Sequence, residues 1–142
     1  DLGKIILDRY FDDYYKAVFE VIAGEDITIA QAEKEILGVT HAAVGGQLAE
    51  EWKFPKNYLN AIAYHHDVRS APRYQRLVCI IHLADIICRQ LKYGNGGDNQ
   101  DPEPEDAALD RFSLGGRGMN ILVEVAQEEL DGAESFLSAL SS

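Results

Sequence analysis

The chain has little positive charge and no long apolar run. Its 142 residues include 13 Lys and Arg against 24 Asp and Glu, which gives a formal charge of -11. Nucleic-acid binders need a positive surface that displaces counterions, and polybasic membrane-surface proteins need clustered cations, so the charge argues against both classes. No apolar run approaches the roughly 20 residues that span a bilayer. We expect no nucleic-acid partner and no membrane association.

Cysteine is also scarce. Cys79 and Cys88 lie in one apolar segment that has a helical pattern. Nine helical residues would place them on opposite faces and about 13 Å apart along the axis, which is too far for a disulfide. Unpaired thiols are typical of a reducing compartment, so the predicted location is the cytoplasm. The sequence begins at Asp1 rather than Met and shows no signal-peptide pattern, so we expect a processed chain or a piece of a longer one.

The pattern of apolar residues predicts an all-α fold. Hydrophobic residues make up 46% of the chain, without strand-like alternation or internal repeats. We expect a compact multi-helix bundle of six or seven helices, punctuated by Gly, Pro and capping Thr residues. The expected helices cover about 5–24, 29–37, 41–52, 55–66, 73–93, 107–112 and 119–140, and a polar loop covers 67–72. The expected organisation is a helical core at 1–93, an acidic Gly/Pro loop at 94–106 and C-terminal helices at 107–142 that pack on the same domain.

One carboxylate stands in the most apolar part of the chain. The run from Leu77 to Ile87, interrupted by His82 and Asp85, is apolar nearly all round and predicts a central helix. An ionised carboxylate there is costly unless it is paired or binds a metal. A salt bridge from Asp85 to Arg89, one turn on, is the structural alternative to a metal-ligating role.

The four histidines gather near expected helix ends and on the central helix. His41 begins a helix and has Gly45 one turn later, where another backbone or a ligand can approach closely. His65 and His66 end a helix side by side. His82 shares a face with Asp85, although a single histidine on an apolar face is more often a core residue. Imidazole and carboxylate together suit Zn, Mn, Fe or Ni. Asp67 and Thr40 are candidate partners that would orient the imidazoles.

The segment from Asp98 to Asp106 is rich in acid and proline. It lacks the glycine and the ligand spacing of an EF-hand, so a mobile, solvated acidic loop is the expectation rather than a calcium site.

The order of short motifs along the chain is more specific than any one spacing. It runs Asp1-Leu-Gly-Lys4, Glu33-x-Glu35-Ile-Leu-Gly38, His41-Ala-Ala-Val-Gly45, Leu48-Ala-Glu-x-Trp52-x-x-Pro55, Ala61-Ile-Ala-Tyr-His-His-Asp67 and Leu83-Ala-Asp85. This order resembles the HD superfamily of metal-dependent phosphohydrolases. Within that superfamily it looks most like the HDOD branch of bacterial signalling output domains, over roughly residues 1–91.

The resemblance implies a site residue by residue. Asp1 matches the aspartate of the family's His-Asp dipeptide, which bridges metals in active members, and Lys4 matches the lysine that contacts substrate phosphate. These two are the implied catalytic residues. The other implied ligands match the metal-binding positions of the two-metal HD-GYP phosphodiesterases. The implied metal set is Asp1, His41, His65, His66 and Asp85.

Two features depart from the family pattern. The histidine of the His-Asp dipeptide is not in the chain, so we expect the chain to be the C-terminal part of a larger HDOD domain. Asp67 is followed by Val-Arg-Ser-Ala-Pro instead of the Asp-Gly-x-Gly-Tyr-Pro run of HD-GYP proteins. This difference lowers the expectation of cyclic di-GMP hydrolysis in particular.

Two functions therefore remain open at the level of sequence. One is a bacterial signalling output domain that keeps one or two divalent transition-metal ions (Fe, Mn, Zn or Ni) and hydrolyses a nucleotide-type phosphoester. The other is a catalytically inactive HDOD module that binds other proteins. The expected partners are signalling proteins or an upstream sensor domain and, for the enzyme, a phosphorylated small molecule.

Overall fold

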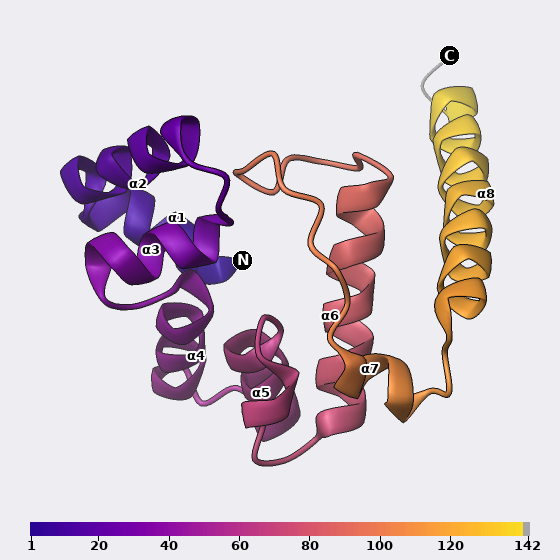
Figure 1. Cartoon of the computed structure of the whole chain (residues 1–142), viewed down its shortest axis with the longest axis horizontal. Coiled ribbons are helices and arrows are strands. Elements are labelled where there is room, and N and C mark those ends of the chain that lie inside the picture. The colour runs from indigo at the N-terminus through magenta and orange to yellow at the C-terminus, as the bar shows by residue number, and fades with distance from the viewer. Residues whose placement is uncertain (141–142) are drawn as a thin grey trace.

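The computed structural model describes residues 1–140, apart from the side chain of Glu134, and is helical throughout (Figure 1). No strand occurs in that range, which confirms the predicted fold class, and eight α-helices replace the six or seven expected. The α-helices are α1 (Leu2–Tyr10), α2 (Asp12–Gly24), α3 (Ile29–Leu37), α4 (His41–Glu51), α5 (Lys56–Tyr64), α6 (Gln75–Gln90), α7 (Asp106–Arg111) and α8 (Gly116–Leu140).

The extra helix arises because the first predicted helix is broken. Phe11 has φ -130° and ψ 35°, outside the helical region, and separates α1 from α2. Asp12 and Asp13 follow in the first turn of α2, where carboxylates interact favourably with the helix dipole. The prediction of one continuous helix was therefore wrong, since apolar spacing alone does not report a one-residue kink.

Capping residues place the next two helices where they were predicted. Thr28 and Gln31 form a reciprocal capping box at the start of α3, and Gly38 ends that helix with φ 73°. The Thr40 side chain accepts the Ala43 N–H and starts α4 at His41. These local interactions fix His41 as the first residue of its helix.

The apolar interior consists of two clusters rather than one. The cluster of α1–α3 is made of Leu7, Tyr15, Val18, Ile29 and Ala32. The second is formed by α6, α7, the start of α8 and the turn after α5, from Val68, Ala71, Val78, Cys79, Leu83, Ile86, Ala108 and Met119. Helices α4 and α5 lie between the two (Figure 1). His41 begins α4, and His65 and His66 directly follow α5.

Glycines let α1, α4 and α5 approach at backbone distance. A Cβ on Gly3 would lie 1.9 Å from the carbonyl oxygen of His41, and one on Gly45 would lie 3.1 Å from the Gly3 nitrogen. A Cβ on Gly46 would lie 2.7 Å from the Cβ of Ala63 in α5. The close approach predicted for Gly45 is thus made by the backbone of α1.

Helix α6 is shorter and less enclosed than predicted. It begins at Gln75 and ends at Gln90, and Ile80 and Ile81 are 45% and 39% exposed. The face that carries Val78, Cys79, Leu83 and Ile86 is buried. Both cysteines are on this helix and neither forms a disulfide. The polar loop predicted at 67–72 contains a 3₁₀ turn, Val68–Ser70, whose Val68 is buried.

The acidic loop is tied to the helices, contrary to the expected mobile and solvated segment. The Asp98 side chain is fully buried and pairs with Arg89 of α6, and it also accepts the Ile29 N–H at the start of α3. Glu105 accepts the Val68 N–H at 3.0 Å. Arg89, the alternative partner proposed for Asp85, is therefore engaged by the loop.

The last helix begins earlier than expected. Residues 116–118, which precede the expected start at residue 119, already form the first turn of α8. Residues 141 and 142 of the predicted 107–142 region lie outside the described residues. No helix within residues 1–140 is both long and apolar enough to cross a membrane.

Removing the carboxylate of Asp98 tests the role of the tied loop. Asp98→Ala leaves the Arg89 guanidinium, whose side chain is 10% exposed, without its buried partner. We expect a loss of about 3 kcal/mol in the free energy of unfolding, measured by urea denaturation. Asp101→Ala, at an exposed site in the same loop, is the matched control. Equal stabilities of the two variants would contradict the structural role.

Candidate metal centre

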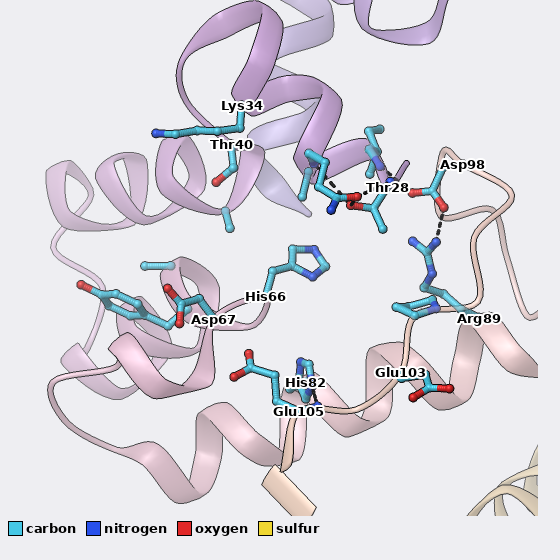
Figure 2. A pocket seen from close by; sticks show the side chains of 17 residues that line it. Thr28, Lys34, Thr40, His66, Asp67, His82, Arg89, Asp98, Glu103 and Glu105 are labelled. Atoms are coloured by element: carbon cyan, nitrogen blue, oxygen red, sulfur yellow. Dashed lines mark hydrogen bonds and ion pairs between the residues drawn. The ribbon is translucent and has the colours of Figure 1, made fainter. Parts of the chain in front are cut away.

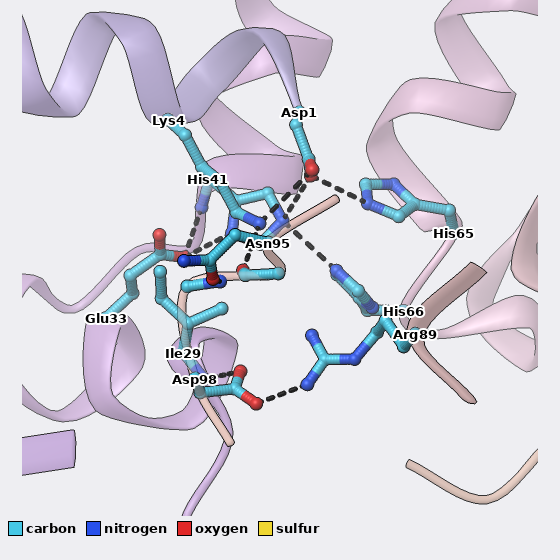
Figure 3. Close-up of polar contacts among 12 residues, drawn as sticks. Asp1, Lys4, Ile29, Glu33, His41, His65, His66, Arg89, Asn95 and Asp98 are labelled. Atoms are coloured by element: carbon cyan, nitrogen blue, oxygen red, sulfur yellow. Dashed lines mark hydrogen bonds and ion pairs between the residues drawn. The ribbon is translucent and has the colours of Figure 1, made fainter. Parts of the chain in front are cut away.

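Four side chains from separate elements converge on one point between the two apolar clusters. One ligand atom each of Asp1, His41, His65 and His66 lies within 4.8 Å of the other three (Figure 3). Asp1 immediately precedes α1, His41 begins α4, and His65 and His66 follow the last residue of α5. The glycine-mediated contacts of α1 with α4 and of α4 with α5 bring these helix ends together.

Glu33 of α3 orients the His41 ring by contacting its Nδ1, the ring nitrogen on the side away from the cluster. One Glu33 oxygen lies 2.6 Å from His41 Nδ1 and 2.7 Å from the His41 backbone nitrogen. The other oxygen accepts the Tyr15 hydroxyl at 3.1 Å. Burial and the charge of Glu33 raise the pKa of Tyr15. Because a carboxylate only accepts, His41 donates through Nδ1, and its Nε2 faces the cluster as a lone pair in the neutral ring.

His65 is oriented in the same sense by the backbone. Its Nδ1 lies 2.8 Å from the carbonyl oxygen of Ile62, which can only accept. The Nδ1 therefore carries the proton, and Nε2 points toward Asp1 as an acceptor. Burial lowers the pKa of His65 to about 4, so the ring is neutral at pH 7.

The result is an excess of electron pairs at the convergence point. Asp1 Oδ1 lies 3.3 Å from His41 Nε2 and 3.8 Å from His65 Nε2. His66 Nε2 lies 3.1 Å from His41 Nε2, and burial together with the neighbouring histidines lowers the pKa of His66 to about 2. With Nδ1 of both rings donating to Glu33 and to the Ile62 carbonyl, His41 Nε2 and His65 Nε2 meet Asp1 Oδ1 as acceptors without a donor between them, whereas the tautomer of His66 is not fixed by a partner.

Lys4 lies beside the cluster but is engaged by the acidic loop. Its Nζ is 3.2 Å from Asp1 Oδ2 and donates to the carbonyl oxygen of Gly96 at 2.8 Å. Burial lowers the pKa of Lys4. The structure thus places the residue predicted to contact phosphate next to Asp1, with its ammonium directed at the backbone of the loop.

Asp85 and His82 separate into different environments. Asp85 lines a cavity of about 370 Å³ together with Asp1 and His65. It is not in the four-residue cluster, so its role as a ligand stays a prediction. His82 is buried, donates through Nδ1 to the His65 carbonyl and accepts the Glu105 N–H at Nε2. His82 is therefore a hydrogen-bonded core residue, as is usual for a single histidine on an apolar helix face.

A second and larger cavity opens on the other side of the cluster. It has a volume of about 560 Å³, and His66 projects into it from the end of α5 (Figure 2). Lys34, Arg89 and the carboxylates of Asp67, Glu103 and Glu105 are among its lining residues. The cluster therefore lies between two cavities, one reached past Asp1 and His65 and the other past His66.

The residues that orient the imidazoles were predicted wrongly. Thr40 caps α4 and Asp67 accepts the Ser70 N–H, while Glu33 and the Ile62 carbonyl hold the rings. Glu33 was noted only as part of a motif. A signal was present, because Glu33 lies beside Ile29 and Ala32 on the buried face of α3. A carboxylate on such a face needs a buried partner.

The depressed pKa values predict a pH-dependent stability of the metal-free chain. Below about pH 6.5 the unfolded chain binds protons at His65 and His66 that the folded chain does not, so stability is full above pH 6.5 and falls as the pH falls toward 4. For His65 the loss between pH 7 and pH 5 is about 2 kcal/mol. Urea denaturation in EDTA measures it, and His65→Gln should flatten the dependence. An unchanged slope in this variant would contradict the assignment.

A family comparison assigns the N-terminal half of the chain. Residues 1–68 match the family model of the HDOD domain. An uncharacterized protein of Treponema pallidum (strain Nichols) is 26% identical over 92 residues, which are 64% of this chain and 18% of that protein.

A solved structure extends the similarity to nearly the whole chain. The crystal structure of an HDOD domain protein of unknown function from Geobacter sulfurreducens matches 92% of this chain with a TM-score of 0.72 and 26% identity. The match covers 48% of that protein, so the chain spans about half its length. Residues 1–68 are therefore similar to the HDOD domain in sequence, and nearly the whole chain is similar to an HDOD domain protein in fold, as the motifs predict.

Proposed function

We propose that this HDOD-type chain binds a divalent transition metal at Asp1, His41, His65 and His66 and hydrolyses a phosphoester as a bacterial signalling output domain. The observation that carries the proposal is the meeting of imidazole lone pairs and a carboxylate at one point. A bound cation would convert these unfavourable acceptor contacts into ligand bonds.

The spacing of the four atoms fits an ion of this class. Tetrahedral ligands at the usual Zn–N distance lie about 3.3 Å from one another. Three separations within the cluster, of 3.1, 3.3 and 3.8 Å, bracket that value, and all four ligand atoms lie within 4.8 Å of one another. The set of nitrogen and oxygen donors suits Zn, Mn, Fe or Ni rather than Ca or Mg. A second ion would need further ligands, and Asp85 is the remaining member of the set that the family resemblance implies.

Different groups of the chain would orient the metal ligands and bind the substrate phosphate. Glu33 holds the His41 ring so that Nε2 faces the centre, and the Ile62 carbonyl does the same for His65. Lys4 would offset charge on a phosphoryl oxygen once its ammonium leaves the Gly96 carbonyl. When bound, the metal supplies Lewis-acid polarisation of phosphate and a more acidic water. With a chain charge of -11, an anionic substrate depends on this local positive charge.

One observation favours the non-catalytic alternative. The Lys4 ammonium is already satisfied by Asp1 and by the loop carbonyl of Gly96, and the loop is anchored through the buried Arg89–Asp98 pair. A domain that keeps this arrangement would bind metal without admitting phosphate to Lys4. In that case it would act as a cytoplasmic interaction module for a sensor or another signalling protein.

Metal binding is the first test of the proposal. We expect the purified chain, stripped and then incubated with Zn²⁺ or Mn²⁺, to retain about one equivalent after gel filtration, measured by elemental mass spectrometry. His41→Gln should lower this by at least about tenfold, while His82→Gln serves as the control outside the cluster. Retention below a tenth of an equivalent for the parent chain would contradict the metal site.

Glu33 offers a second test that involves no direct ligand. Glu33→Gln keeps the size of the side chain but weakens the acceptor for His41 Nδ1, so the metal dissociation constant should rise about 10- to 100-fold. Competition with a metallochromic chelator measures it. Glu35→Gln, at an exposed position two residues on, should change little, and equal affinities for the two variants would remove Glu33 from the site.

Hydrolysis separates the enzyme from the binding module. For the metal-loaded chain we expect turnover of bis(p-nitrophenyl) phosphate, followed by absorbance, and a loss of at least about tenfold in Lys4→Ala with metal content unchanged. A metal-loaded chain without turnover above the metal-free control favours the non-catalytic alternative.

A further inference from the structure

Helix α8 carries an apolar repeat that is longer than its contact with the domain. Positions four and three residues apart are apolar without a break from its second turn to its end. The stripe consists of Met119, Val123, Ala126, Leu130, Ala133, Leu137 and Leu140. This is the a and d pattern of a coiled-coil helix, sustained over about three heptads.

Only the first part of the stripe is used inside the domain. Met119 is 6% exposed and Val123 packs against the second apolar cluster beneath α6. Farther on, Ala133 is exposed and Leu140 is 69% exposed, and Phe136, beside the stripe, is 63% exposed. Figure 1 shows α8 at one edge of the molecule, with its C-terminal end away from the other helices. The second half of the stripe is an apolar helix face open to solvent.

The charges that flank this face are of one sign. With the stripe as positions a and d, Glu129 occupies a g position. Glu124, Glu128 and Asp131 add to the negative charge of the helix, against one Arg117 at its start. Residues at e and g lie opposite the flanking residues of a partner helix and select its charge.

We propose that the C-terminal half of α8 binds an amphipathic helix of a protein partner whose apolar stripe is flanked by Lys or Arg. Ala133, Phe136 and Leu140 would provide the apolar contact, and Glu129 would face a basic residue of the partner helix. Small Ala133 allows the two helices to approach closely at the middle of the face.

The same charges disfavour a second copy of this chain. An antiparallel pair sets g positions opposite g positions and so brings Glu129 near Glu129 of the other copy. In either orientation two helices of net negative charge would come together. An anionic lipid surface is disfavoured for the same reason, because interfacial helices use a basic polar face.

The test uses a synthetic helical peptide of about four heptads with Ile at a, Leu at d and Lys at e and g, and a matched peptide with Glu at e and g. Binding of the fluorescent peptides to the whole chain is followed by anisotropy. We expect the Lys peptide to bind at least about tenfold more tightly than the Glu peptide, with a weaker affinity at high salt.

Substitutions locate the binding face. Leu140→Asp and Ala133→Asp should each weaken binding of the Lys peptide by about tenfold, whereas Ser135→Asp adds the same charge at an f position and should change it little. All three positions are exposed, and circular dichroism checks that the helix content is kept. Sedimentation equilibrium measures self-association of the free chain.

Three outcomes would overturn the inference. These are absence of binding by the Lys peptide, equal binding of the two peptides, and binding that Leu140→Asp and Ala133→Asp leave unchanged. Dimerisation of the parent chain that Leu140→Asp abolishes would instead identify a second copy as the occupant. None of these outcomes depends on metal binding or hydrolysis.

Discussion

The candidate site depends on one close contact, the crossing of α1 over the start of α4. Gly3 meets the His41 carbonyl and the Gly45 nitrogen at a distance that no side chain at position 3 would allow. A second close contact, Gly46 on Ala63, holds α5 against the other side of α4. At these contacts no side chain of the glycine keeps the helix backbones apart. The ends of the three helices therefore lie close enough to bring Asp1, His41 and the histidine pair into one cluster.

Around this crossing, buried charge is satisfied in two separate networks. Glu33 joins Tyr15 in the N-terminal cluster to His41 at the candidate centre, so the interior of α1–α3 directly orients a ligand. Asp98 joins Arg89 of α6 to the first N–H of α3 and fastens the acidic loop across the molecule. In each network the buried carboxylate accepts hydrogen bonds from several donors, because a carboxylate buried without partners would be costly. At the centre, His41 Nε2 and His65 Nε2 face Asp1 Oδ1.

Much of the fold could be predicted from sequence because its signals are local. Thr28, Gly38 and Thr40 mark helix boundaries through bonds to residues three or four positions away, and the structure keeps all three. The break at Phe11 was missed because the apolar spacing continues across it. The anchored loop was missed because Asp98 binds the backbone of Ile29, 69 positions earlier in the chain. Arg89 pairs with Asp98 instead of with Asp85, the alternative that its helical spacing suggested.

By itself the sequence determined the all-α class, the main helix positions and the motif order that identifies an HDOD-type domain. It also singled out His41, His65 and His66 near expected helix ends, while Asp1 was implied by the family resemblance. Only the tertiary structure decided that Glu33 supports His41, that His82 belongs to the core and that the acidic loop covers Lys4. These contacts join helix ends and loops that are distant in sequence. The spacing of residues along one helix therefore cannot predict them.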